Sequence, residues 1–309
     1  MNKVVIVAGP TASGKSEVSI KLAKALNGEV VSCDSAQIYE GMDIGTSKVS
    51  KKDMQGIEHH LLDICKPQDD FTVADFKREC EKVIGDIHSR GKLPILCGGT
   101  GLYINAIMFD MQFEGVRTEK EVRQKFEEMA RKHGKEYLYK ELQRIDPSVA
   151  ERIHPNNTVR VIRALSVLES EGGDGRSSNL GDLSLAGKRE SAFDFIKLVI
   201  TWPRDVLYSR INERVDTFFN EGLIHEVQGL LAGGVPKEAN SLKAIGYKEI
   251  VAYLNGETDL KTANELIKRN TRRFAKRQLT WFKRYDDFRR FDMSETTDEE
   301  IVSWVAKNM

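Results

Sequence analysis

The sequence predicts an α/β protein with a parallel sheet, interrupted by a helical insertion. Short β-branched apolar runs of buried-strand length alternate with helical segments from the first residues onward. A glycine-rich loop, Gly9–Ser16, lies between the first such run and the first helix. Strand character is then absent from Phe113 to Asp194 and returns afterwards. Ligands of such sheets bind at the carboxyl ends of the strands, so we expect function in the loops that follow them.

The composition is that of a globular protein, and its balanced net charge indicates neither a nucleic-acid nor a membrane partner. The 309 residues are 30% charged and 40% hydrophobic, and 47 Lys+Arg balance 47 Asp+Glu. The N-terminus does not read as a signal peptide, and no apolar run approaches the length of a membrane span. The four cysteines are scattered without a C-x-x-C pair, which argues against zinc and disulfides. We expect a cytoplasmic protein.

Each element of the predicted sheet has its own signal. A helix follows the glycine-rich loop and ends at Asn27-Gly28, and a second helix starts at a capping box from Thr72 to Asp75 and ends near Gly91. Five apolar runs of strand length are predicted to form the sheet: Lys3–Ala8, Glu29–Asp34, His59–Ile64, Lys92–Gly99 and Phe195–Trp202.

The middle of the chain has a different character. Residues 117–171 are rich in mixed charge and poor in strand signals, which predicts helices, and residues 170–187 have the composition of a flexible loop. The sequence therefore predicts a core of residues 1–112 and 195–309 that ends in basic helices. Residues 113–194 would form a helical insertion.

The loop after the first strand has the pattern G-x-x-x-x-G-K-[ST], read here as GPTASGKS. A strand before it and a helix after it are the context in which this pattern binds phosphate, through backbone N–H groups and the helix N-terminus. Lys15 would add a charge, and the Ser16 hydroxyl is placed to bind Mg²⁺. The alternative is a glycine turn that binds nothing. The candidate phosphate-binding residues are Gly9, Pro10, Thr11, Ala12, Ser13, Gly14, Lys15 and Ser16.

Two further strand ends carry polar candidates. Asp34 ends the second predicted strand and reads as a general base, a metal-holding aspartate or a helix cap. Thr100 follows Gly98 and Gly99, which would let the backbone approach a ligand closely, or it caps a tight strand-to-helix turn. The residue types alone leave these alternatives open.

A basic stretch near the C-terminus is a candidate surface for a polyanion. Lys268 to Arg290 holds ten Lys or Arg against two acids, and its first six cations share one half of a helix. Ile267, Phe274 and Trp281 recur every seven residues and are predicted to form its core face. A merely solvated helix face is the alternative.

Taken together and in order, these motifs resemble the tRNA dimethylallyltransferases, the tRNA isopentenyltransferases (IPP transferase family) of the bacterial MiaA type. The resemblance rests on GPTASGKS, VVSCDSAQIYEGMDIGTSK, HHLLDI, LPILCGGTGLYINAI, ERIHPNNTVRVIRALSV, LKAIGYKEI and FAKRQLTWFKR, and it spans nearly the whole chain. It implies a core like that of the P-loop NTPases. Residues 171–184 depart from the family's short basic turn. Eukaryotic relatives often carry a C-terminal zinc finger that this chain lacks.

The resemblance implies a specific reaction. The loop would hold the diphosphate of dimethylallyl diphosphate with Mg²⁺, and N6 of adenosine at tRNA position 37 would attack C1 of the dimethylallyl group. Asp34 would accept or orient the amine proton, and Thr100 would contact the diphosphate as it leaves. The product would be N6-(dimethylallyl)adenosine.

The resemblance also implies where the anticodon stem-loop of tRNA binds. It maps contacts onto 34–37, Thr100, Arg123, 159–163 and 243–248, and we expect the chain to act as a monomer. The candidate tRNA-binding residues are Asp34, Ser35, Ala36, Gln37, Thr100, Arg123, Arg160, Arg163, Lys243 and Lys248.

Three other functions share part of this pattern. A small-molecule kinase would share the loop and the sheet, but that function accounts for neither the helical insertion nor the basic helix. An adenylate isopentenyltransferase shares Asp34 and Thr100 but needs no long RNA surface. An RNA-binding ATPase would bind RNA without transferring a group.

Overall fold

The computed structural model describes residues 2–113, 120–170 and 190–309 of the chain. They divide into two compact units, each described here by itself. The larger unit is Met1–Met108 with Ala192–Met309, and the smaller is Phe109–Ser191. The prediction for residues 171–184 lies outside the described residues.

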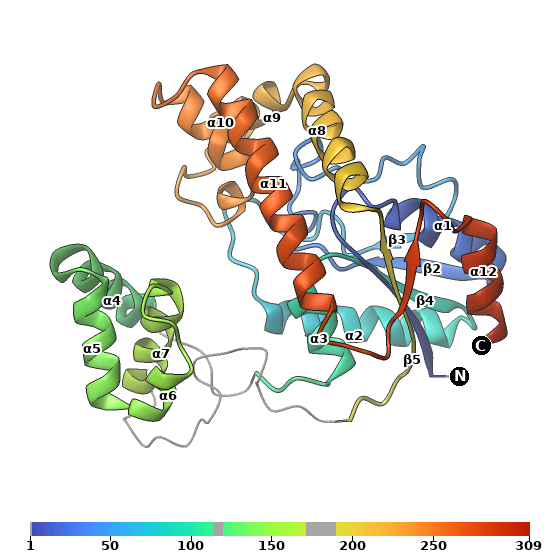
Figure 1. Ribbon diagram of the computed structural model, residues 1–309, viewed down its shortest axis with the longest axis horizontal. Coiled ribbons are helices and arrows are strands. Elements are labelled where there is room, and N and C mark those ends of the chain that lie inside the picture. Colours follow the sequence, from blue (N-terminus) through green and yellow to red (C-terminus); the bar gives the residue numbers. More distant parts are fainter. Residues whose placement is uncertain (1, 114–119, 171–189) are drawn as a thin grey trace. The chain divides into compact units, whose positions relative to one another are not determined.

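The larger unit is built on a six-stranded sheet in which every strand pair is parallel, in the order β3-β2-β4-β1-β5-β6 (Figure 1). This confirms the predicted parallel α/β core. The central strand β1 is buried on both faces, as its continuous apolar run requires. The strands are β1 (Lys3–Ala8), β2 (Gly28–Ser32), β3 (His59–His60), β4 (Leu93–Gly98), β5 (Asp194–Thr201) and β6 (Arg289–Asp292).

Two strands differ from the prediction. The run His59–Ile64 leaves the sheet after two residues, because Leu61 and Asp63 adopt positive φ values of 61° and 52° that strand geometry excludes. Strand β6 was not predicted, since it has four residues and begins with two arginines. It pairs with β5 at the edge of the sheet, where charged side chains reach solvent and no apolar run is needed.

Helices cover the sheet. Val5 and Val7 of β1 pack in one cluster with Leu22 of α1 and with Ile301 of α12. As predicted, a capping box of Thr72 and Asp75 starts α2. None of the helices in the described ranges is long and apolar enough to cross a membrane. The helices of this unit are α1 (Lys15–Ala25), α2 (Val73–Ser89), α3 (Gly101–Met108), α8 (Arg204–Glu221), α9 (Leu223–Ala232), α10 (Tyr247–Leu254), α11 (Leu260–Phe282) and α12 (Asp298–Lys307).

A second hydrophobic core fixes the long connection between β2 and β3. Ile38 and Met42 of this connection pack with side chains of α8, α9, α10 and α11. The carboxylate of Glu226 accepts hydrogen bonds from the backbone N–H groups of residues 43–45, at 2.7–3.2 Å, and from the hydroxyl of Tyr247, at 2.6 Å. These bonds hold the segment after Asp34 against the helices.

In the described part of the smaller unit, helices are the only regular secondary structure. Leu138, Leu142, Val161 and Leu165 lie at helical spacing and form its separate core. Its helices are α4 (Lys120–His133), α5 (Lys135–Ile145), α6 (Pro147–Glu151) and α7 (Thr158–Ser170).

Candidate active site

The phosphate loop connects β1 to α1, and its two glycines set its path. Gly9 has a φ of 149°, and a Cβ there would lie 2.3 Å from the carbonyl oxygen of Ile200. Gly14 has a φ of 94° and caps the N-terminus of α1. Only glycine adopts these conformations without strain. The loop therefore follows its observed path because of its sequence.

Side chains of the β5–α8 connection, of α8 and of α11 hold the loop from outside. The indole N–H of Trp202 donates to the carbonyl of Ser13 at 3.1 Å, and Nε of Arg210 donates to the carbonyl of Ala12 at 3.0 Å. The side chain of Gln278 accepts from the N–H of Thr11 at 2.9 Å. In a trans peptide unit the N–H points opposite to the C=O. Holding the two carbonyls from outside therefore turns the next two N–H groups, those of Ser13 and Gly14, the other way.

Lys15 lies at the base of this loop with its charge only partly compensated. Its ammonium group donates to the carbonyl of Pro10 at 2.6 Å. Burial lowers the pKa of Lys15 to about 8, and the nearby guanidinium of Arg214 acts in the same direction. The charge of a bound anion would act against both effects and raise the pKa of Lys15 again, so the site favours a ligand with several negative charges.

Arg214 is a candidate ligand-binding residue that sequence reasoning missed. It lies on α8, lines the same cleft, and within the described ranges it forms neither a hydrogen bond nor an ion pair. Its burial lowers the pKa of its guanidinium, and Arg210 one helical turn earlier adds to this. The available signal was the four-residue spacing of these two arginines on the helix after β5. That signal has meaning only once β5 is known to lie beside β1.

Asp34 and Thr100 are brought together because they follow adjacent strands. The N–H of Cys33 donates to the carbonyl of Cys97 at 2.8 Å, and the N–H of Thr100 donates to the carbonyl of Cys33 at 3.2 Å. The Thr100 hydroxyl accepts from the N–H of Ser35 at 3.1 Å. One carboxylate oxygen of Asp34 accepts from the N–H of Ala36 at 2.9 Å, which orients the side chain.

The glycines around Thr100 allow close packing within the protein, and the expectation that they also admit a ligand stays a prediction. A Cβ on Gly98 would lie 2.2 Å from the carbonyl oxygen of Cys33. A Cβ on Gly99 would lie 2.0 Å from the side-chain nitrogen of Gln278, and one on Gly101 would lie 2.2 Å from the ring of Trp281. The missing side chains therefore let β2 and α11 approach this turn.

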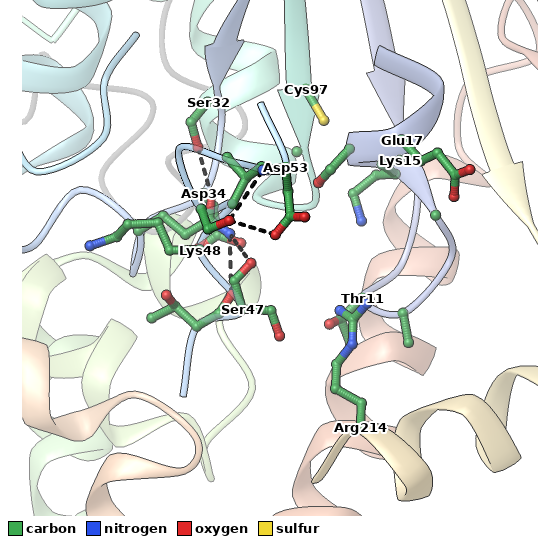
Figure 2. A pocket seen from close by; sticks show the side chains of 18 of the residues that line it. Thr11, Lys15, Glu17, Ser32, Asp34, Ser47, Lys48, Asp53, Cys97 and Arg214 are labelled. Atoms are coloured by element: carbon green, nitrogen blue, oxygen red, sulfur yellow. Dashed lines mark hydrogen bonds between the residues drawn. The ribbon is translucent and has the colours of Figure 1, made fainter. Parts of the chain in front are cut away.

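These groups surround one cleft of about 790 Å³. Lys15 and Arg214 lie on one side of it, and Asp34 and Lys48 lie on the other (Figure 2). Thr100 does not line the cleft itself. Its hydrogen bond with Ser35 holds it beside the turn that contains Asp34. The cleft thus combines a cationic side with a carboxylate opposite it.

The side chain of Gln37, a predicted tRNA-binding residue, forms hydrogen bonds within the protein. Its side-chain carbonyl accepts from the hydroxyl of Ser32 at 3.1 Å, and its NH₂ group donates to the carbonyls of Thr46 and Ser47 at 3.2 and 3.4 Å. The residue lines the cleft while it holds the segment 46–47 against β2. Ser35, by contrast, is exposed.

Three predicted tRNA-binding arginines lie in the smaller unit. Arg123 is on α4, where it pairs with Glu127 at 3.0 Å, and Arg160 and Arg163 are on α7. Arg163 has a lowered pKa because it is partly buried and Arg123 is near. Two guanidinium groups close together form a local site that suits a phosphate.

Lys243 and Lys248 are exposed in the larger unit and do not line the cleft. Lys243 ends a short 3₁₀ turn, Ser241–Lys243, and donates to the side chain of Asn240 at 2.9 Å. Lys248 lies in the first turn of α10.

The basic helix α11 is present, but its buried side differs from the prediction. Phe274 and Trp281 are only partly buried, and the guanidinium groups of Arg277 and Arg284 lie over their rings. A seven-residue repeat drifts around a straight helix with 3.6 residues per turn, so the actual stripe follows spacings of four and three. Its buried residues are Ala263, Ile267, Ala275, Gln278 and Phe282.

The cations of α11 are unequal in exposure. Arg272 is partly buried and donates to the side chain of Asn212 at 2.5 Å, and Lys268 pairs with Asp216 at 2.7 Å. Arg273, Lys276 and Arg277 are exposed. The outer cations, rather than the whole half-helix, are therefore those available to a polyanion.

In the part of the chain that the structure describes, no group of three or more His, Cys, Asp or Glu side chains is arranged to hold a metal ion. Ser16 is exposed in the first turn of α1, directly after Lys15. A single hydroxyl beside an anion-binding loop fits an ion that takes most of its ligands from phosphate oxygens and water.

The chain matches the family model described as IPP transferase over residues 37–285. The tRNA dimethylallyltransferase of Alkaliphilus metalliredigens is 45% identical over 307 residues, covering 99% of this chain and 97% of the relative. That of Bacillus cereus is 46% identical over 305 residues, covering 99% and 93%.

Solved structures agree in fold. The full-length tRNA isopentenylpyrophosphate transferase of Bacillus halodurans superposes with a TM-score of 0.74 at 42% identity, covering 99% of this chain and 96% of the other. A eukaryotic dimethylallyltransferase acting on tRNA gives a TM-score of 0.80 at 28% identity, covering 100% and 79%. The chain therefore belongs to the IPP transferase family, as its motifs implied.

Proposed function

We propose that this chain transfers a dimethylallyl group from dimethylallyl diphosphate to N6 of adenosine 37 in tRNA, forming N6-(dimethylallyl)adenosine and diphosphate. The observation that carries the proposal is the cleft in which the phosphate loop faces Asp34. Family membership supports the reaction, and the geometry of the cleft supports the roles proposed below for its residues.

The cationic side of the cleft binds the leaving group. As the bond between C1 and oxygen breaks, its electron pair stays on the diphosphate, whose charge grows. Lys15, Arg214 and the N–H groups of the phosphate loop are placed to stabilise that charge. Lys15 and Arg214 are already partly buried at the cleft before the ligand arrives, so little reorganisation is needed at the moment of reaction.

Asp34 is the proposed general base on the opposite side. The lone pair of N6 forms the new bond to C1, and the carboxylate of Asp34 takes the proton that N6 loses. The amino group of adenosine is a weak nucleophile, so orientation contributes as much as basicity. The bond from the Ala36 N–H leaves the second carboxylate oxygen of Asp34 to face the substrate.

Thr100 is the proposed contact between the two sides. Its hydroxyl oxygen accepts from the Ser35 N–H, and its hydroxyl proton donates to the Ser35 hydroxyl at 3.4 Å. In the proposed complex this long bond would be exchanged for one from the Thr100 hydroxyl to the diphosphate or its bridging oxygen. Thr100 also caps α3, because its backbone carbonyl accepts from the N–H groups of Tyr103 and Ile104. This structural role uses the backbone, so it does not exclude the proposed role of the hydroxyl.

Mg²⁺ is the proposed cofactor, with Ser16 as its protein ligand and the diphosphate supplying most of the others. The ion neutralises phosphate charge when bound. The tRNA would contact exposed cations, namely Lys243, Lys248 and the outer face of α11 in the larger unit, and the Arg123–Arg163 pair in the smaller one.

An assay with matched acceptors tests this function. The chain is incubated with labelled dimethylallyl diphosphate, Mg²⁺ and either tRNA, AMP or ATP. We expect label in tRNA at position 37 and none in the nucleotides. Label in AMP or ATP would instead identify an adenylate isopentenyltransferase. ATP hydrolysis or phosphate transfer without prenylation would indicate the kinase or the RNA-binding ATPase.

The pKa of Lys15 predicts how binding of the donor varies with pH. A diphosphate favours the charged ammonium and raises its pKa, so binding takes up a proton only above the free pKa of about 8. The affinity for an unreactive dimethylallyl diphosphate analogue should be flat from pH 7 to 8. Above that it should fall by up to about tenfold per pH unit, the limit for one linked proton.

The variant Lys15→Met should remove this pH dependence and weaken binding by at least about tenfold, or 1.4 kcal/mol. Lys24→Met, at the exposed end of the same helix, is the control and should bind like the wild type. Calorimetric titration measures both. A wild-type pH profile in Lys15→Met would remove this lysine from the diphosphate site.

The variant Asp34→Asn should separate catalysis from binding. The amide keeps the shape of the carboxylate but cannot accept a proton, so single-turnover transfer should fall by about 10²- to 10⁴-fold. Affinity for the diphosphate analogue should stay near the wild-type value. Asp53→Asn, a second cleft-lining carboxylate, is the control and should transfer normally.

If Asp34 holds the metal instead, Asp34→Asn should lose diphosphate affinity and its Mg²⁺ dependence. Transfer at the full rate would leave Asp34 as the residue that caps its turn.

Charge reversal on α11 should weaken tRNA binding and its salt dependence. Lys276→Glu with Arg277→Glu alters two exposed cations, and each lost phosphate contact should reduce the slope of log affinity against log salt by about one. The control reverses Lys261 and Lys307, also exposed, at the start of α11 and the end of α12. Filter binding at four salt concentrations measures the slope. Equal slopes in both double variants would mean that this face is only solvated.

A further inference from the structure

Gln278 is a buried polar side chain on α11 that the proposed reaction does not yet use. Its residue is 5% exposed, so both ends of the side chain need partners inside the protein. Its carbonyl oxygen accepts from the N–H of Thr11 at 2.9 Å, and its NH₂ group donates to the carbonyl of Gly99 at 3.0 Å. One amide thus joins the phosphate loop after β1 to the turn after β4.

The bridge continues to the proposed general base. Gly99 precedes Thr100, whose hydroxyl accepts from the N–H of Ser35, the residue next to Asp34. The glycine is needed for the approach, since a Cβ on Gly99 would lie 2.0 Å from the Gln278 nitrogen. Three hydrogen bonds, joined by the peptide links from Gly99 to Thr100 and from Ser35 to Asp34, therefore connect the leaving-group side of the cleft, through Gln278, to the side that carries Asp34.

We propose that Gln278 is a positioning residue for prenyl transfer, which holds the phosphate loop and the Thr100 turn at the separation that the reaction needs. The inference rests on the proposed function. Gln278 need not touch either substrate. Without it, the Thr11 N–H and the Gly99 carbonyl lose their partner, and both loops gain freedom. A misplacement of about 1 Å between reacting groups lowers a rate by about 10²-fold.

Two substitutions separate hydrogen bonding from packing. Gln278→Met keeps the length of the side chain and removes both bonds. Gln278→Glu keeps the acceptor for Thr11, but its ionised carboxylate has no proton to donate to Gly99. When that carboxyl is protonated it offers one donor and one acceptor, as the amide does. Lowering the pH should therefore restore the Glu variant but not the Met variant.

The experiment measures single-turnover transfer to tRNA from pH 5.5 to 8 and expresses each variant as a ratio to the wild type. The titrating and charged groups of the same cleft, including Lys15, Asp34, Arg210 and Arg214, are present in all the proteins, so their own pH effects are divided out. Gln228→Met and Gln228→Glu, on the exposed side of α9, are the matched controls. Thermal melting and tRNA affinity show that each variant is folded.

We expect Gln278→Met to transfer about 10- to 100-fold more slowly than the wild type at every pH, with tRNA affinity unchanged. At pH 8 the transfer rate of Gln278→Glu, relative to the wild type, should be as low as that of Gln278→Met. It should rise at least tenfold by pH 5.5. The proposal is wrong if Gln278→Met transfers within threefold of the wild type, or if the Glu ratio does not rise on acidification. Failure of the wild type itself to modify tRNA would instead contradict the proposed function.

Discussion

The parallel pairing of β2, β4, β1 and β5 is the constraint on which the site depends. Because every pair is parallel, the loops that follow these strands leave the sheet at the same edge. The pairing continues one step past the strands, through the bond from the Cys33 N–H to the Cys97 carbonyl. Asp34 and Thr100 therefore meet at fixed positions beside the phosphate loop, although 66 positions separate them in the numbering of the chain.

The electrostatics of the cleft follow from what the fold leaves unpaired. Elsewhere in the larger unit, buried charge is compensated: Glu29 accepts from Arg90, Lys92 and His60, which hold the pKa of its carboxyl well below the usual range. Lys15 and Arg214 have no such acidic partner among the described residues, and burial lowers both pKa values. Uncompensated cations destabilise the free protein, so a polyanion gains affinity by relieving that cost.

The sequence alone predicted the parts of the fold and site that depend on local pattern. The phosphate loop, β1 and the capping box at Thr72 have signals within a few residues, and the structure places each where it was expected. Strand β6 has no such signal, because an edge strand with two arginines lacks an apolar run. The spacing of Arg210 and Arg214 gains meaning only once β5 is known to lie beside β1. Gln278 has no signal of its own, since its partners Thr11 and Gly99 are far away in the chain.

Helix α11 carries both the exposed cations and the side chains that contact the loops of the cleft. Its exposed side presents Lys276 and Arg277 to solvent, while the next residue, Gln278, reaches the phosphate loop and Gly99. One turn later Trp281 packs on Gly101, directly after Thr100. Two glycines of the CGGTG segment, Gly99 and Gly101, thus let this helix pack closely on the turn. An RNA phosphate bound to the outer face would be held by the same helix that contacts the phosphate loop and the turn at Gly99. Loss of either face should therefore affect transfer through a different step: binding for the cations, and the chemical step for Gln278.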